Sequence, residues 1–457
     1  MKGMDKKYNL WVLSWPIFIE LLLQFLLGTV DTLMVSRVSD DAVAVVGFAN
    51  QLFAALTTLF TIVASGAGIL IAQKLGARKE EDARTISVIA VKATFGIGLL
   101  LSIVLMAMPR TIALALQMPE SLLPLADTYI SIVGGGMLLT ALMTTLSTVI
   151  RNTGNTKAPM VTAIGMNVVH IVLNYGFIYG AFGLPQWGLT GVALSTLVSR
   201  LLATLLLFYM FIYAFERKMW LPDLKLWHRG LFREVMNIGW PLGVNMASWV
   251  FSQLVIYVFL NMLGPKELAA RTYMNSLESF CFLLGFSLAL AGQIKAAYLY
   301  GEGRMREVSQ TAFRMMLAGQ IVVIVNALII FIFGRQLLGF FTDDPEIIAL
   351  GASLLGLNLL LQPGKMLNMG LGDTLNAVGD TRFVMKISLF SMWIVSVGIS
   401  YVLGVELGWG LIGIYVCMIA DEYLRGALCL WRWRSKKWAR GVNPGPAAPG
   451  TGAAAEA

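Results

Sequence analysis

Apolar runs of about twenty residues or more recur from one end of the chain to the other. Each run is long enough to cross a hydrocarbon core about 30 Å thick as an α-helix, which keeps its backbone hydrogen bonds within one segment. The pattern therefore predicts an all-α polytopic membrane protein with twelve transmembrane helices. The predicted spans are 10–35, 43–72, 86–108, 122–150, 159–181, 188–214, 236–262, 268–299, 309–333, 346–374, 383–403 and 409–431.

The two halves of the chain resemble each other at a constant offset. The stretch "LSWPIFIE" at 13–20 recurs as "IGWPLGVN" at 238–245, and the same offset of 225 residues pairs Gly76 with Gly301. Such self-similarity indicates a duplicated fold. We predict a six-helix bundle at 1–214, a cytoplasmic linker at 215–235, a second six-helix bundle at 236–433, and a basic and then disordered cytoplasmic tail at 434–457.

After a slip of three residues, "WGLTGV" at 187–192 lies against "WGLIGI" at 409–414, so the repeat extends to the last helix of each half. Each half has an even number of predicted spans, and both halves therefore begin on the same side of the membrane. This is the parallel type of internal repeat. Two such bundles can rock against each other around a site at their interface, which is the geometry of alternating access.

Composition and charge agree with a membrane protein. Hydrophobic residues make up 57% of the chain and charged residues 13%, whereas soluble domains carry about a quarter charged residues. With a cytoplasmic N-terminus, roughly 24 of the 34 Lys and Arg residues fall on cytoplasmic flanks. This placement of the positive residues predicts that both termini are cytoplasmic, and it accounts for the net charge of +8 without a nucleic-acid partner. The cysteines, Cys281, Cys417 and Cys429, lie in predicted spans without metal-ligand spacing.

Several stretches carry a family resemblance over nearly the whole chain. They are "WPIFIELLLQFLLGTVDTLMVSRVSDDAVAVVG", "AGILIAQKLGARKEEDA", "LSTVIRNTGNTKAPM" and "NYGFIYGAFGLPQWGLTGVALST". Together they resemble a multidrug and toxic compound extrusion (MATE) transporter. The resemblance implies export of organic cations and related amphiphiles in exchange for protons or sodium. We expect a multi-pass protein of the bacterial plasma membrane, surrounded by lipid, acting as a monomer and without a cofactor.

Two predicted helices carry polar stripes. At 100° per residue, Glu20, Gln24 and Asp31 lie within about 40° of one another on the first helix. Asn167, His170 and Asn174 lie within about 60° on the fifth helix. A carboxylate at a helix centre costs about 2.5 to 3.5 kcal/mol on insertion scales, so both stripes should face the bundle interior. Facing each other, they would form a polar pocket in the N-terminal half.

The repeat provides an internal control for these polar residues. At the same offset, the four equivalent positions in the second half are apolar. Asp31, Asn167, His170 and Asn174 correspond to Ile256, Met392, Val395 and Ile399, respectively. A role in holding the fold together would be needed in both halves. The difference indicates a function confined to the N-terminal half, although a structural hydrogen-bonding role for Asp31 and a neutral packing role for His170 remain open.

The family resemblance implies roles for particular residues. Some family members hold the coupling ion with an aspartate on helix 1, an Asn and an Asp on helix 5, and a Thr on helix 6. Matched by motif, these positions are Asp31, His170, Asn174 and Thr196. Here the two changes on helix 5 remove an anionic oxygen ligand and add an imidazole, which favours protons over sodium. We also assign Asn167 and Glu20 to the coupling site, and Pro16 to a bend in helix 1.

Further polar residues are candidates for the substrate cavity: Gln24, Gln51, Glu278, Lys365 and Asn368. Glu278 could attract a cationic substrate, or it could form a buried ion pair with Lys365, since each charge would be costly alone.

The functional alternatives are sodium-coupled drug antiport, a flippase for lipid-linked saccharides of the same superfamily, and a passive channel. The sequence contains no Walker A loop and no convergent catalytic set, so we do not predict an enzyme.

Overall fold

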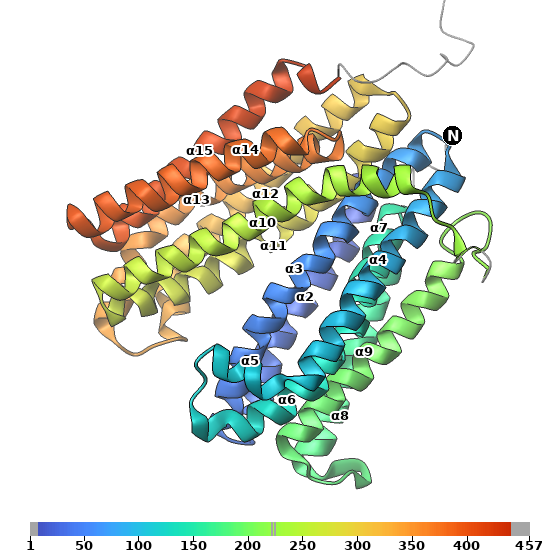
Figure 1. The fold of residues 1–457 in the computed structure, drawn as a ribbon. Helices are drawn as coiled ribbons and strands as arrows, with labels where there is room; N and C mark the ends of the chain where they lie inside the picture. The colour runs from blue at the N-terminus through green and yellow to red at the C-terminus, as the bar shows by residue number, and fades with distance from the viewer. Residues whose placement is uncertain (1–7, 221–222, 224, 440–457) are drawn as a thin grey trace, which may run out of the picture.

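The computed structural model describes residues 8–220, 223 and 225–439. The chain forms two helical lobes that lie side by side (Figure 1). The first lobe contains α2 (Leu10–Val35), α3 (Asp40–Gly76), α4 (Glu80–Ala107), α5 (Pro109–Ala115), α6 (Leu123–Gly135), α7 (Met137–Asn152), α8 (Lys157–Tyr179) and α9 (Gly188–Ile212). The second lobe contains α10 (Arg229–Leu263), α11 (Pro265–Gly301), α12 (Met305–Gly339), α13 (Pro345–Ala377), α14 (Thr381–Ser391) and α15 (Gly410–Arg434).

Within the described residues, ten helical segments are long and apolar enough to cross a membrane. One more span is the pair α6 and α7, which bends by 40° between Gly135 and Met137. The predicted span 122–150 is therefore broken in the middle. The last predicted span, 409–431, corresponds to α15, which carries Asp421, Glu422 and Arg425 near its centre. The predicted all-α membrane fold with two bundles is confirmed, with α14 continuing through π-helical turns at Met392–Ile399 and Tyr401–Glu406.

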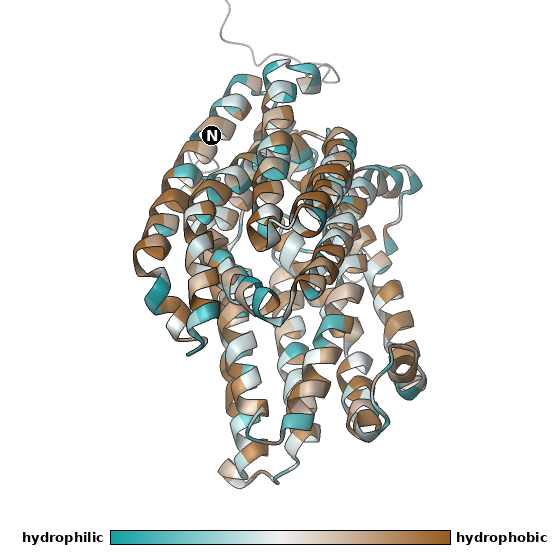
Figure 2. Ribbon diagram, turned by 90° about the vertical axis from the view of Figure 1, so that its left-hand side faces the viewer, coloured by the Kyte–Doolittle hydropathy of each residue, from teal (hydrophilic) through white to brown (hydrophobic). Residues whose placement is uncertain are grey.

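The helix ends follow local capping chemistry. Ser39 precedes α3 and its side chain accepts a hydrogen bond from the Ala42 amide at 3.0 Å, with Asp40 and Asp41 in the first turn. Such residues satisfy free amides at a helix N-terminus and complement its dipole. Between their ends the helices are largely hydrophobic, while hydrophilic residues concentrate in the loops and helix ends (Figure 2). Many large apolar side chains are exposed along them, as expected for surfaces that contact lipid.

The linker and tail differ from the predicted boundaries. α10 begins at Arg229, inside the predicted linker 215–235, because His228 caps it by accepting a hydrogen bond from the Leu231 amide at 3.2 Å. The preceding segment is held by the fully buried Arg84 of α4, which donates to Asp223 at 2.8 Å. At the other end, Trp438 stacks on Trp433 at 4.3 Å. The rest of the predicted tail, 440–457, lies outside the described residues.

The hydrophobic core joins the two lobes at one end only. A large cluster of buried residues near the N-terminal end of the structure includes side chains of α3 and α4 together with α11, α13 and α15, and a smaller cluster joins α2 to α11. Toward the other end the core divides into one cluster within the first lobe and one within the second. The lobes accordingly diverge away from the end where the N-terminus lies (Figure 1).

Two glycines related by the repeat allow this close approach. A Cβ atom at Gly76 of α3 would overlap the carbonyl oxygen of Tyr298 on α11, and one at Gly301 would overlap the carbonyl oxygen of Gln73 on α3. Gln73 and Tyr298 are themselves repeat partners. The equivalent helices α3 and α11 therefore cross with their backbones in contact, and each glycine makes room for the other helix.

We predict that Gly76→Ala separates the lobes at this crossing, because the added methyl group meets backbone and costs about 1–3 kcal/mol of overpacking. Spin labels at positions 78 and 306, both exposed near this end, should then move apart relative to wild type. Gly96→Ala, at a helical position with no heavy atom within 4 Å of the new Cβ, is the matched control. Equal label distances in both variants would contradict this role of Gly76.

Candidate functional site

The predicted polar stripes of α2 and α8 meet in the first lobe. The Oδ1 atom of Asp31 lies 3.1 Å from His170 Nε2 and accepts a hydrogen bond from Asn174 Nδ2 at 2.9 Å. His170 Nε2 and Asn174 Nδ2 are 3.0 Å apart. His170 and Asn174 are one helical turn apart, which places both on the face that packs against α2. Asp31 thus has two polar partners on a second helix, as the sequence predicted.

A residue of α9 orients the imidazole. Ser199 Oγ lies 3.5 Å from His170 Nδ1 and donates its own proton to the Thr196 carbonyl oxygen at 3.0 Å. Since the Ser199 hydroxyl proton is used, its oxygen is free to accept from an Nδ1–H group. This arrangement favours a proton on Nδ1 and turns Nε2 toward the carboxylate. A further proton can then lie either on Nε2 or on Asp31 Oδ1.

Two of the predicted coupling residues lie nearby without contacting Asp31. Thr196 is buried and donates its hydroxyl proton to the Val192 carbonyl at 3.1 Å. Asn167 is buried, and its Oδ1 has no hydrogen-bond partner within the described part of the chain; the same is true of Asn174 Oδ1. Two amide oxygens close to the site are therefore free to accept from water or to contact a cation.

The sequence analysis missed a cation in this region. Arg200 of α9 donates to Thr140 Oγ1 at 2.9 Å and acts electrostatically on both Tyr129 and Asp31. A cation in the membrane interior needs a compensating anion. The sequence did contain a signal for Arg200. It lies inside the predicted span 188–214, and an arginine in an apolar span is as unusual as the aspartate of α2.

Glu20 lies elsewhere in the structure than the predicted coupling site. Eleven residues separate it from Asp31 on α2, a rise of about 16 Å along the helix axis. Both Glu20 carboxylate oxygens accept from Arg151 Nη2 of α7, at 2.8 and 2.9 Å. Pro16 is also on α2, which is one continuous helix from Leu10 to Val35. The structure therefore does not bring Glu20 to Asp31.

Of the substrate-cavity candidates, Gln24 of α2 and Gln51 of α3 are exposed. Next to Gln24, Phe25 contacts Phe280 of α11 with ring centroids 6.4 Å apart, so this part of α2 faces the second lobe.

Glu278 and Lys365 form the ion pair that the sequence analysis considered, with an additional partner. Lys365 Nζ lies 2.9 Å from Glu278 Oε2, while Glu278 Oε1 accepts from Arg271 Nη1 at 3.0 Å and from the Tyr415 hydroxyl at 2.6 Å. The Glu278 side chain is 1% exposed. One carboxylate is shared by two cations, so the group has a net charge of +1. This favours a structural role for Glu278 over attraction of a cationic substrate.

Asn368 belongs to a second polar group in this lobe. Its Nδ2 donates to Glu422 Oε2 of α15 at 2.8 Å, and Arg425 forms ion pairs with both Glu422 and Asp421. With the three-residue slip, Asp421 and Glu422 are the repeat partners of Ser199 and Arg200. The polar positions of α9 are thus occupied by acidic residues in α15, at the equivalent place in the other lobe.

Comparison with known proteins places this architecture. The MatE family model matches residues 16–176 and 241–402, two segments related by the repeat offset. The uncharacterized transporter YisQ of Bacillus subtilis is 31% identical over 437 residues, which cover 96% of each chain. A probable multidrug resistance protein NorM of Thermotoga maritima is 26% identical over 93% of this chain and 92% of its own. The solved structure of a multidrug resistance MATE family transporter in an outward-facing conformation superposes with a TM-score of 0.87, at 18% identity, over 97% of this chain and 99% of that one.

The duplicated helical lobes and these relatives define a multi-span membrane transporter of small molecules. More specifically, the chain belongs to the MatE family of multidrug and toxic compound extrusion transporters, as the sequence resemblance implied. The MatE family is a family of transporters, which is consistent with the prediction that the chain is not an enzyme.

Proposed function

We propose that this chain exports organic cations or amphiphilic compounds in exchange for protons. The observation that carries the proposal is the contact between Asp31 of α2 and His170 of α8, which places a carboxylate beside an imidazole inside a membrane-spanning bundle. The names of several relatives, which are described as multidrug resistance proteins, support the substrate class. The absence of these two side chains from the equivalent positions Ile256 and Val395 supports a dedicated role in the first lobe.

The geometry suggests how a proton changes the site. With Asp31 ionised, its Oδ1 accepts from Asn174 and from a protonated His170 Nε2, and the three groups hold α2 against α8. Protonation of Asp31 removes the charge that these donors share. The contact weakens, α2 can move relative to α8, and the balance shifts toward the state that releases substrate. Proton and substrate therefore stabilise opposite conformations, which is sufficient for exchange.

The energetics follow from charge balance. Exchange of one proton for one monovalent cation moves no net charge, so the membrane potential contributes nothing and only the pH difference drives export. Each pH unit then supports about tenfold accumulation.

We infer a monomer in the bacterial plasma membrane with both termini in the cytoplasm. The joined end of the lobes, near the N-terminus, is then the cytoplasmic end.

Sodium coupling is the second candidate, and one observation favours it. Asn167 Oδ1 and Asn174 Oδ1 are buried without partners among the described residues, and amide oxygens are suitable ligands for a hard cation.

Transport by purified protein in proteoliposomes distinguishes proton coupling from sodium coupling. We expect an imposed pH gradient to drive movement of a fluorescent organic cation, and an imposed sodium gradient at uniform pH to have no effect. The reverse result would establish sodium coupling.

His170→Gln should lower the exchange rate about tenfold, because glutamine can still donate to Asp31 but cannot carry a proton. The dependence of the rate on pH should also become simpler, with one ionisation in place of two coupled ones. The chain has one other histidine, His228, whose Nδ1 accepts from a backbone amide at the start of α10, and His228→Gln is the matched control. If His170→Gln keeps the wild-type rate and pH profile, His170 is a neutral packing residue.

A further inference from the structure

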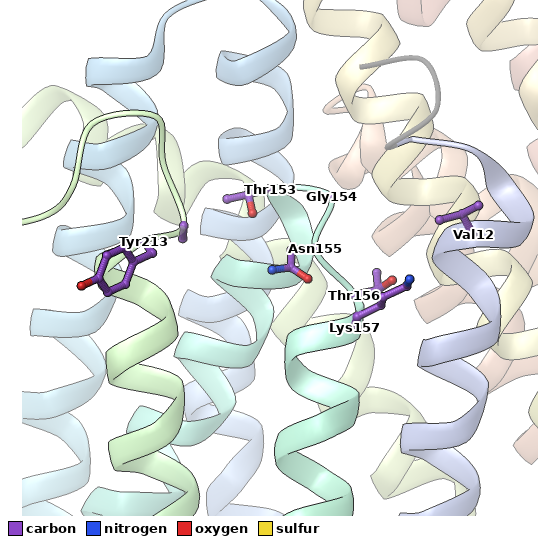
Figure 3. Close-up of a pocket in the computed structure, with 8 residues that line it drawn as sticks. Val12, Thr153, Gly154, Asn155, Thr156, Lys157 and Tyr213 are labelled. Carbon is purple, nitrogen blue, oxygen red and sulfur yellow. The ribbon is translucent and has the colours of Figure 1, made fainter. Parts of the chain in front are cut away.

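A cavity of about 280 Å³ opens at the end of the first lobe that holds the N-terminus. It lies between the start of α2, the loop that joins α7 to α8, and the end of α9. The loop residues 153–157 form its floor, with Val12 on one side and Tyr213 on the other (Figure 3). None of these residues belongs to the Asp31 site, and the proposed exchange mechanism does not use them.

The loop presents hydrogen-bond donors and positive charge to the cavity. Gly154 has a φ of +84°, which lets the chain turn sharply before α8. Asn155 Oδ1 accepts from the Ala158 amide at 3.2 Å and caps the helix, while Lys157 is its first residue. The N-terminus of a 23-residue helix carries a partial positive charge that favours anions.

Thr156 is the independent sign of a ligand. The residue is 2% exposed and lines the cavity, and its hydroxyl has no hydrogen-bond partner within the described part of the chain. The residue is therefore buried except where it borders the cavity, and its hydroxyl proton is available to a group bound there. Figure 3 shows Thr156 beside Lys157, so one donor and one cation lie at the same place in the cavity. An anionic oxygen there would satisfy both.

The equivalent loop of the second lobe supplies its own anion. Asp380 is the repeat partner of Asn155, and both of its oxygens accept from Arg432, at 2.6 and 3.2 Å. In the first lobe the partner positions are Asn155 and Met210. The backbone is otherwise alike, since Gly379 has a φ of +86°. Only the first-lobe loop therefore lacks a built-in carboxylate.

The cavity also lies at the level where lipid headgroups are expected. Trp11 and Trp15 on the first turns of α2 and Tyr209 and Tyr213 at the end of α9 are all at least 50% exposed. Exposed Trp and Tyr residues near helix ends mark the membrane interface. Lys218 lies over the Tyr213 ring, 5.0 Å from its centroid, and adds a second cation beside the cavity.

We propose that this cavity binds the phosphate group of an anionic phospholipid from the cytoplasmic leaflet. The phosphate oxygens accept from the Thr156 hydroxyl and the α8 N-terminus, Lys157 and Lys218 balance the charge, and the acyl chains run along the exposed apolar surfaces of α2 and α9. Phospholipid is favoured over free phosphate, which has the same chemistry, because the cavity is bordered by residues typical of the membrane interface.

The test measures lipid binding to the purified full-length protein in detergent by native mass spectrometry, with phosphatidylglycerol and phosphatidylcholine in parallel. Wild type should prefer phosphatidylglycerol. Lys157→Gln should weaken its binding about fivefold, the effect of one lysine near an anionic surface. Thr156→Val should weaken it about tenfold through loss of a hydrogen bond to a charged group.

The repeat provides matched controls. Arg382→Gln and Thr381→Val make the same changes in the second-lobe loop, and both should leave the preference unchanged. Lys157 is exposed, so Lys157→Gln keeps the test valid even if Thr156→Val folds poorly. Equal binding of the two lipids by wild type, or equal losses in the control variants, would overturn the proposal. Displacement of phosphatidylglycerol by inorganic phosphate would also overturn it, by assigning the cavity to a free anion.

Discussion

Replacing Asp31 with Asn is expected to abolish export driven by a pH gradient, with a fall of about a hundredfold or more in the initial rate. Asparagine has nearly the shape of aspartate and can hydrogen-bond to His170 and Asn174, so the packing of α2 against α8 is largely kept. It cannot exchange a proton, however, and the site would remain in its neutral state throughout the cycle. The measurement is substrate movement in proteoliposomes under an imposed pH difference.

The control removes a carboxylate that the proposed cycle does not use. Asp41 is exposed in the first turn of α3, and Asp41→Asn should transport at the wild-type rate. Substrate binding by Asp31→Asn in the absence of a gradient shows whether the variant is folded. Transport by Asp31→Asn at more than a tenth of the wild-type rate would show that the coupling proton binds at another residue.

Replacing Glu278 with Gln is expected to have the largest effect on stability. Glu278 is the only anion that contacts both Arg271 and Lys365 in the described structure, and it is almost fully buried. Its neutralisation leaves two cations without a counter-charge inside the second lobe. Breaking a buried ion pair by removing one partner costs about 3–5 kcal/mol. We therefore expect a large decrease in the thermal unfolding midpoint and a low yield of folded protein.

Lys365→Met provides the comparison within the same group of residues. It removes one of the two cations and leaves Glu278 paired with Arg271 and hydrogen-bonded to Tyr415, so the charge of the group falls from +1 to zero. This variant should be much less destabilised than Glu278→Gln. If the two variants unfold at the same temperature, the charge balance inferred from the contacts is incorrect. If Glu278→Gln is stable but does not transport, Glu278 acts on the substrate.

The hydrophobic pattern predicted the positions of the helices better than their ends. Hydropathy reports the part of a helix that lies in lipid, and α3 extends beyond the predicted 43–72 to Asp40–Gly76. Its earlier start follows from the Ser39 cap, which lies outside the apolar run. The break between α6 and α7 was not predicted, since both halves of that span are apolar. α10 begins at Arg229 because the His228 side chain caps it. In the sequence, His228 lies in a polar stretch that was assigned to the linker.

Contacts in the candidate site could be predicted where the positions of polar residues on one face of each helix were enough to bring them together. His170 and Asn174 meet Asp31 because each helix places its polar residues on one side. Glu20 shares that side of α2, but angular position contains no information about the distance along the axis. The partners of Glu20 and Glu278, which are Arg151 and Arg271, lie on other turns or other helices. The Glu20–Arg151 pair joins two helices and depends on how they pack, whereas Arg271 and Glu278 lie two turns apart on α11, a spacing that the sequence analysis did not use.

The most direct test of the central claim is proton release on substrate binding. Purified protein in weakly buffered detergent solution, with a pH indicator, should release protons when an organic cation is added, because substrate and proton stabilise opposite states. Asp31→Asn should bind the same compound without releasing a proton. Equal proton release by Asp31→Asn and wild type, or substrate binding by wild type with no proton release, would contradict proton exchange at Asp31.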